Sequence, residues 1–69
     1  MNRVAEVNRA LKKMGRAERL RRGAGYYYFS EGDAMAWPTS SVYGVSRADA
    51  LSVERWLAEF EELRKAGER

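Results

Sequence analysis

The feature of this sequence that most constrains its fold is an apolar stripe near the C-terminal end. Its members recur at intervals of three and four residues: Val53, Trp56, Leu57, Phe60 and Leu63. That spacing predicts an amphipathic helix, because residues three and four apart share one helix face. Ser52 precedes the stripe as a natural N-cap, and Gly67 marks the fraying end. Such a helix must bury its stripe against another element.

A second apolar stripe lies near the N-terminus. It consists of Val4, Val7, Leu11 and Met14, again spaced by three and four residues. The pattern predicts a helix over about residues 2–14, with Asn2 as N-cap and Gly15 as stop signal. The chain is therefore expected to have one helix at each end, each with a single apolar face.

The segment between the two helices favours β-structure. Aromatic and β-branched residues occur in YYYF and again in SSVYGV, residues 40–45. Residues 30–33, SEGD, are expected to form the tight turn of a hairpin, with Gly32 at positive φ. Residues 34–37, AMAW, are expected to form a short or edge strand, because Pro38 holds its neighbour extended and donates no ladder hydrogen bond.

Residues 16–22, RAERLRR, allow two interpretations. Their composition favours a helix, whereas the flanking Gly15 and Gly23 favour a short edge strand. We assign a strand to this segment.

Together these elements predict a single α+β domain over residues 1–69. Both apolar stripes need a common surface, and a small antiparallel sheet of two to three strands supplies it when both helices pack on one face, in α-β-β-β-α order. A chain of 69 residues without cysteine has no disulfide, and a domain of this size buries only about 60% of its unfolded surface. The other face of the sheet is left to water or to a partner.

The chain lacks the residues on which most enzymes depend. It contains no histidine and no cysteine, which removes the commonest general base, the thiolate nucleophile and the usual zinc ligands. Glu31 and Asp33 flank a glycine in a pattern typical of a solvated turn. The glycines of RRGAG precede a strand rather than a helix, unlike those of phosphate-binding loops. We expect no enzymatic activity, no catalytic residue, no metal and no cofactor.

The charge is unevenly distributed along the chain. The net charge is +3, but residues 1–25 hold eight Lys/Arg against two Glu, and residues 26–69 hold five against eight Asp/Glu. The basic N-terminal third suits nucleic acid, anionic lipid or an acidic protein surface. We disfavour a membrane, since the core needs the apolar stripe of the first helix. The N-terminus has no apolar run typical of an export signal, so we expect a cytoplasmic protein.

The aromatic strand carries the candidate binding surface. If Phe29 faces the core, Tyr27 shares its face, whereas Tyr26 and Tyr28 point outward, because side chains alternate along a strand. Outward tyrosines can also be plain cross-strand packing with hydrated hydroxyls. The alternative is that these two rings contact a partner.

Basic residues precede the outward tyrosines. Arginines beside tyrosines are used both by single-stranded nucleic-acid platforms and by protein interfaces. The arginines nearest in sequence are Arg19, Arg21 and Arg22. If the ligand is a nucleic acid, Lys12, Lys13 and Arg16 are expected to contact phosphates.

The other aromatic residues divide between core and surface. Trp56 belongs to the helical stripe and is expected in the core. Trp37, beside a proline at a strand end, is either a lid on the core or an exposed anchor. In the SSVYGV strand, Tyr43 and Val45 are expected to face inward with Tyr27.

The motifs GYYYF, GDA, SSVYGV and LSVERWLAEF resemble those of a group of short bacterial and phage-borne α+β proteins of uncharacterised function. The resemblance covers about residues 11–60. It implies an architecture and a home on mobile genetic elements, and it implies no activity. The element order is also similar to that of double-stranded-RNA-binding domains, but their basic start of the last helix is replaced here by SVERW, in which Arg55 has acidic neighbours.

We therefore expect a non-catalytic interaction protein of the bacterial host cytoplasm. As an accessory factor of the phage type, it would bind and modulate a host protein or nucleoprotein complex, including inhibition in the manner of anti-defence or anti-CRISPR proteins. The alternative is a nucleic-acid-binding module that uses the basic N-terminal third and the sheet tyrosines. A homodimer formed through the aromatic face is a third expectation.

Overall fold

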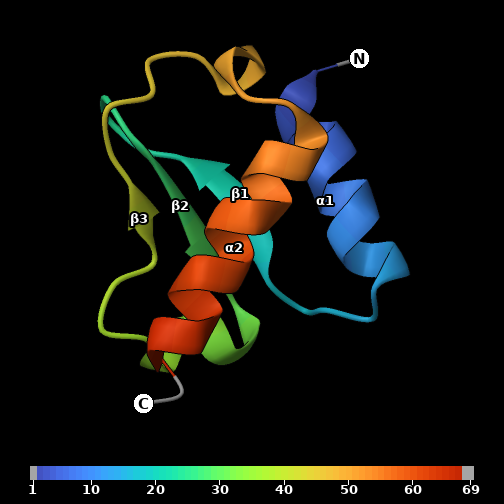
Figure 1. Cartoon of the computed structure of the whole chain (residues 1–69), viewed down its shortest axis with the longest axis vertical. Helices are drawn as coiled ribbons and strands as arrows, with labels where there is room; N and C mark the ends of the chain where they lie inside the picture. Colours follow the sequence, from blue (N-terminus) through green and yellow to red (C-terminus); the bar gives the residue numbers. More distant parts are fainter. Residues whose placement is uncertain (1, 68–69) are drawn as a thin grey trace.

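The computed structural model describes residues 2–67 and has the predicted α-β-β-β-α order (Figure 1). The elements are α1 (Arg3–Lys13), β1 (Arg19–Arg22), β2 (Tyr27–Ser30), the 3₁₀ turn η1 (Gly32–Ala36), β3 (Ser41–Val42), the 3₁₀ turn η2 (Ala48–Ala50) and α2 (Val53–Gly67). The three strands form one antiparallel sheet in the order β1-β2-β3, and both helices lie on the same face of it. The expected α+β fold is therefore confirmed.

Both helices begin at the predicted caps. The Asn2 side chain accepts a hydrogen bond of 2.7 Å from the backbone N–H of Ala5, and the Ser52 hydroxyl accepts one of 3.1 Å from Arg55. These bonds satisfy donors that the first turn of a helix leaves free. After α1 the chain passes through Gly15 at φ 79°, a conformation that glycine adopts without strain.

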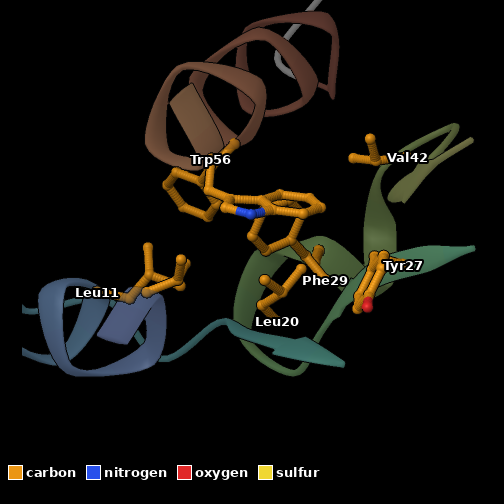
Figure 2. Close-up of a cluster of buried hydrophobic side chains, with 9 residues drawn as sticks. Leu11, Leu20, Tyr27, Phe29, Val42 and Trp56 are labelled. Atoms are coloured by element: carbon orange, nitrogen blue, oxygen red, sulfur yellow. The ribbon is translucent and has the colours of Figure 1, made fainter. Parts of the chain in front are cut away.

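The core fills the space between the helices and the sheet (Figure 2). The apolar side chains buried there are Val7, Leu11, Leu20, Tyr27, Phe29, Ala34, Val42, Trp56 and Phe60. The Tyr27 ring meets Trp56, and the Phe29 ring meets Phe60, each edge to face with ring centroids 5.3 Å apart. Tyr27 and Phe29 thus face the core as the sequence predicted, and β2 is the central strand.

The short strand β1 is fixed by contacts with α1. Leu20 lies opposite Phe29 in the sheet and is buried, so one side of RLRR belongs to the core. On the free edge of β1, the Asn8 side-chain amide donates to the Leu20 carbonyl (3.2 Å) and accepts from the Leu20 N–H (2.6 Å). Asn8 therefore bonds to this edge as a neighbouring strand would. The strand assigned to residues 16–22 is confirmed for residues 19–22.

The connections between strands differ from the prediction. The tight hairpin is formed by GAGY, where the Gly23 N–H donates to the Tyr26 carbonyl at 2.8 Å and Gly25 takes φ 79°. The tight hairpin predicted at residues 30–33 is wrong, and so is the strand predicted at residues 34–37. Residues 32–36 instead form η1, which buries Ala34 in the core. Gly32 does take a positive φ, of 54°.

A buried carboxylate explains this course of the chain. Glu18 is 1% exposed, and both of its oxygens accept hydrogen bonds of 3.0 Å from the Arg16 guanidinium. The Asp33 N–H, in η1, donates to the same carboxylate at 2.8 Å. Burial raises the pKa of Glu18, but the bonds from Arg16 and from the backbone N–H groups of Glu18 and Asp33, with the Arg16 charge, bring it below its ordinary value. The turn η1 thus closes over an ion pair made fifteen residues earlier.

Replacement of Gly32 by alanine should destabilise the protein. The added Cβ would lie 2.8 Å from the Glu18 carboxyl carbon, at a backbone φ that L-residues rarely adopt. Strain of this kind costs about 1–3 kcal/mol, and it should appear in urea denaturation as a lower midpoint with an unchanged slope. Gly15→Ala is the matched control, because Gly15 also has positive φ but its added Cβ meets no atom within 4 Å. Equal losses in the two variants would show that the contact with Glu18 contributes nothing.

Candidate interaction surface

The face of the sheet opposite the helices carries three neighbouring tyrosines. The rings of Tyr26 and Tyr28 have centroids 6.0 Å apart, and those of Tyr26 and Tyr43 are 5.4 Å apart. Tyr26 and Tyr28 are half-buried, whereas Tyr43 is 71% exposed. We call Tyr26, Tyr28 and Tyr43 the tyrosine face. The outward direction predicted for Tyr26 and Tyr28 is confirmed.

The inward direction predicted for Tyr43 is wrong. Val42 lies opposite Tyr27 in the sheet and is buried, so the next residue, Tyr43, points to the other side. Gly44 then turns the chain at φ 81°, and Val45 packs against the core as expected. This alternation adds Tyr43 to the pair of tyrosines foreseen from the sequence.

A glycine in the hairpin positions the first of these rings. A Cβ added to Gly23 would lie 2.6 Å from the tip of the Tyr26 ring, so the ring lies directly against the Gly23 backbone. Gly23 therefore allows Tyr26 to lie flat on the hairpin, beside Tyr28 and Tyr43.

The structure gives different surroundings to the three arginines that the sequence places together. Arg21 lies opposite Tyr28 on the tyrosine face, where it donates to the Ser30 hydroxyl at 3.2 Å and lies 3.8 Å from Glu31. One terminal nitrogen of Arg19 donates to the backbone carbonyls of Arg16 and Glu18 at 2.9 and 2.7 Å. Arg22 lies opposite Tyr27 and so belongs to the helix side of the sheet. Of the three, Arg21 is the one that joins the tyrosines with its charge exposed.

An open groove adjoins the tyrosine face. Tyr28 and Tyr43 line it from the sheet, and Met35, Trp37 and Pro38 line it from the connection between β2 and β3. Met35 is 84% exposed, which is unusual for a side chain of its size and polarity. Met35 was not among the residues predicted from the sequence, although the apolar run AMAW beside a glycine turn could have indicated it.

Trp37 combines the two roles that the sequence left open. Its ring meets Phe60 edge to face at 5.6 Å and packs against Gly67 at the end of α2. It is half-buried and also lines the groove. Trp37 is therefore a lid on the core whose outer side belongs to the groove.

The proposed phosphate-contacting residues lie away from the tyrosine face. Lys12 and Lys13 are exposed in the last turn of α1, on the helix side of the sheet. Arg16 is held by Glu18, lies 3.5 Å from Asp33 and places its guanidinium over the Phe60 ring at 5.5 Å. Arg16 thus has a structural role, and the basic residues do not form one continuous surface with the tyrosines.

Acidic side chains are scattered over the surface. Among residues 2–67, no group of three or more of them is arranged to hold a metal ion. Over the same residues, neither helix has the length and apolar character needed to span a bilayer.

Comparison of this chain with protein-family models, with curated proteins and with solved structures finds no match.

Proposed function

We propose that this protein is a non-catalytic interaction protein that binds a protein or nucleoprotein partner through the tyrosine face, Arg21 and the adjoining groove. The observation that carries the proposal is the uncovered tyrosine face. Tyr43 and Met35 expose most of their surface. Tyrosine, tryptophan, methionine and arginine are the residues enriched at protein interfaces.

The kind of partner is inferred from size and from the motifs GYYYF and SSVY. These motifs resemble short phage-borne and bacterial proteins, and a rigid domain of 69 residues suits a stoichiometric modulator. We propose an accessory factor of a mobile element that acts in the bacterial cytoplasm on a host complex, including inhibition of a defence complex as anti-CRISPR proteins do. This step rests on resemblance, since fold alone does not define function.

Nucleic-acid binding is the second candidate. Arg21 beside Tyr28 favours it, because a base can stack on a ring while a guanidinium holds the phosphate. The exposed Lys12 and Lys13 add positive charge, although from the other side of the sheet. Arg16 and Arg19 are hydrogen-bonded within the protein, so they add less to nucleic-acid binding than a count of basic residues suggests.

The proposal predicts that Tyr43→Ala and Tyr28→Ala abolish partner capture and keep the fold. Truncation of a central interface tyrosine typically costs 2 kcal/mol or more, which corresponds to roughly thirtyfold weaker binding. The measurement is affinity capture from a bacterial lysate, with circular dichroism of each variant. Met14→Ala is the control, since Met14 is an exposed apolar residue at the end of α1 on the other side of the sheet.

Nuclease treatment of the lysate distinguishes the two candidates. A captured protein that survives the treatment supports the first. The second is supported by binding to purified DNA or RNA if a plot of log affinity against log salt concentration falls with a slope of about −0.7 to −0.9 for each phosphate contacted. Capture by Tyr43→Ala and Tyr28→Ala at the level of the unmodified protein contradicts the first, and light scattering would show whether the captured partner is a second copy.

A further inference from the structure

A second hollow lies on the helix side of the sheet, away from the tyrosine face. It is formed where the start of α1, the end of β1 and the segment around η2 meet, and it has a volume of about 650 Å³. Residues from these segments and from the start of β2 line it, among them Arg3, Arg22, Tyr27, Ser46 and Arg47. Nothing in the interaction proposed above uses this hollow.

The charge of the hollow is positive. Arg3 is bound to Glu6 at 3.2 Å and to the Leu51 carbonyl at 2.8 Å, and Arg47 is paired with Asp49 at 3.0 Å. The Arg22 side chain makes no hydrogen bond or ion pair with any of residues 2–67, and it is exposed. Three guanidinium groups therefore face two carboxylates. The Arg22 guanidinium is left with its donors unused by the protein.

The Tyr27 hydroxyl also opens into the hollow. The side chain is 4% exposed, and its hydroxyl has no hydrogen-bond partner among residues 2–67. No fully buried side-chain nitrogen or oxygen in this part of the chain lacks a partner, so the hydroxyl must keep access to the hollow that Tyr27 lines. A polar group on an otherwise buried ring needs a ligand or water as its partner.

We propose that this hollow binds a phosphate group, either as inorganic phosphate or as a small phosphate monoester. The Arg22 guanidinium offers a fork of N–H donors, and the hydroxyls of Tyr27 and Ser46 add single donors, a set that suits a tetrahedral oxyanion. Arg3, the first residue of the eleven-residue helix α1, lines the hollow, so the positive end of the helix dipole lies beside it. The site is independent of the tyrosine face.

The test is a titration of the full ¹⁵N-labelled chain at constant ionic strength, with inorganic phosphate in one arm and glycerol 2-phosphate in the other. Saturable shifts of the Arg22, Tyr27 and Ser46 amides are expected, without shifts of Tyr28 or Tyr43. The arm with the tighter binding identifies which source the site prefers. Shifts that sodium chloride reproduces at the same ionic strength, or that do not saturate, would overturn the proposal.

Two substitutions test the donors. Arg22→Gln and Tyr27→Phe should each weaken binding by roughly ten- to a hundredfold, the range for a hydrogen bond to a charged group. Arg21→Gln is the control, because it removes the same charge from the adjacent position on the opposite face of β1. A loss with Arg21→Gln equal to that with Arg22→Gln would mean general electrostatic attraction and would overturn the site. If Tyr27→Phe does not fold, the comparison of Arg22→Gln with Arg21→Gln decides alone.

Discussion

Replacing Trp56 with alanine should leave this protein largely unfolded at room temperature. The side chain is completely buried, its ring meets Tyr27 at 5.3 Å, and its indole N–H donates to the Ala48 carbonyl at 2.7 Å. Truncation of a buried tryptophan costs about 3–5 kcal/mol. A chain of this length has a total stability of roughly 3–10 kcal/mol. The cost is therefore comparable with the whole stability of the domain.

Circular dichroism and urea denaturation measure this effect. Trp56→Ala should show weak helical signal or a transition at much lower urea than the unmodified protein. Trp37→Ala provides the matched control, because the same atoms are removed from a half-buried position at the edge of the core. A Trp56→Ala transition with the same midpoint as Trp37→Ala would contradict the central place of Trp56 in the core.

The second large effect is expected at the buried ion pair. Glu18→Gln removes the charge that two Arg16 nitrogens and the Asp33 N–H contact. Loss of one partner of a buried pair costs about 3–5 kcal/mol, and we expect about 3 kcal/mol, because Arg16 keeps some access to water. Urea denaturation at pH 7 gives this difference directly. Glu61→Gln is the control, since Glu61 is paired with Arg64 on the surface of α2 and should lose at most about 1 kcal/mol.

The same ion pair predicts how stability changes with pH. The folded-state pKa of Glu18 lies below its ordinary value of 4.5. The stabilisation is therefore complete above the unfolded-state pKa and is lost as the pH falls through the folded-state pKa. The difference in unfolding free energy between the unmodified protein and Glu18→Gln should be largest near pH 7 and should shrink in acid below the ordinary pKa. A difference that is the same at pH 7 and at pH 3 would contradict the ion pair.

The sequence predicts the two helices well, because their signals are local. The spacing of apolar residues and the caps at Asn2 and Ser52 lie within a few residues of what they specify. The course of the chain after β2 could not be predicted in this way. The turn η1 depends on the Glu18 carboxylate, which lies fifteen residues earlier in the sequence and is held there by Arg16.

The candidate surface was predicted in part, for a similar reason. The outward direction of Tyr26 and Tyr28 follows from alternation within one strand, once Phe29 is placed in the core. The direction of Tyr43 depends on which residue of β3 lies opposite Tyr27, and that register comes from pairing between strands. The separation of Arg21 from Arg22 reflects alternation along β1, because adjacent residues of a strand face opposite sides.

The Asn8 amide limits how this sheet can grow by joining other molecules. A strand that arrived at the free edge of β1 would have to displace the amide from both backbone groups of Leu20. At β3, at the other end of the sheet, the side-chain contact with the backbone is weaker, because the Thr39 hydroxyl accepts from the Ser41 N–H at 3.5 Å. Two copies could pair once through β3, and the resulting dimer would present a plugged edge at each end. Open-ended fibre growth needs two free edges per molecule. The Asn8 amide, which occupies one of the two edges, is therefore expected to stop strand addition after a single pairing.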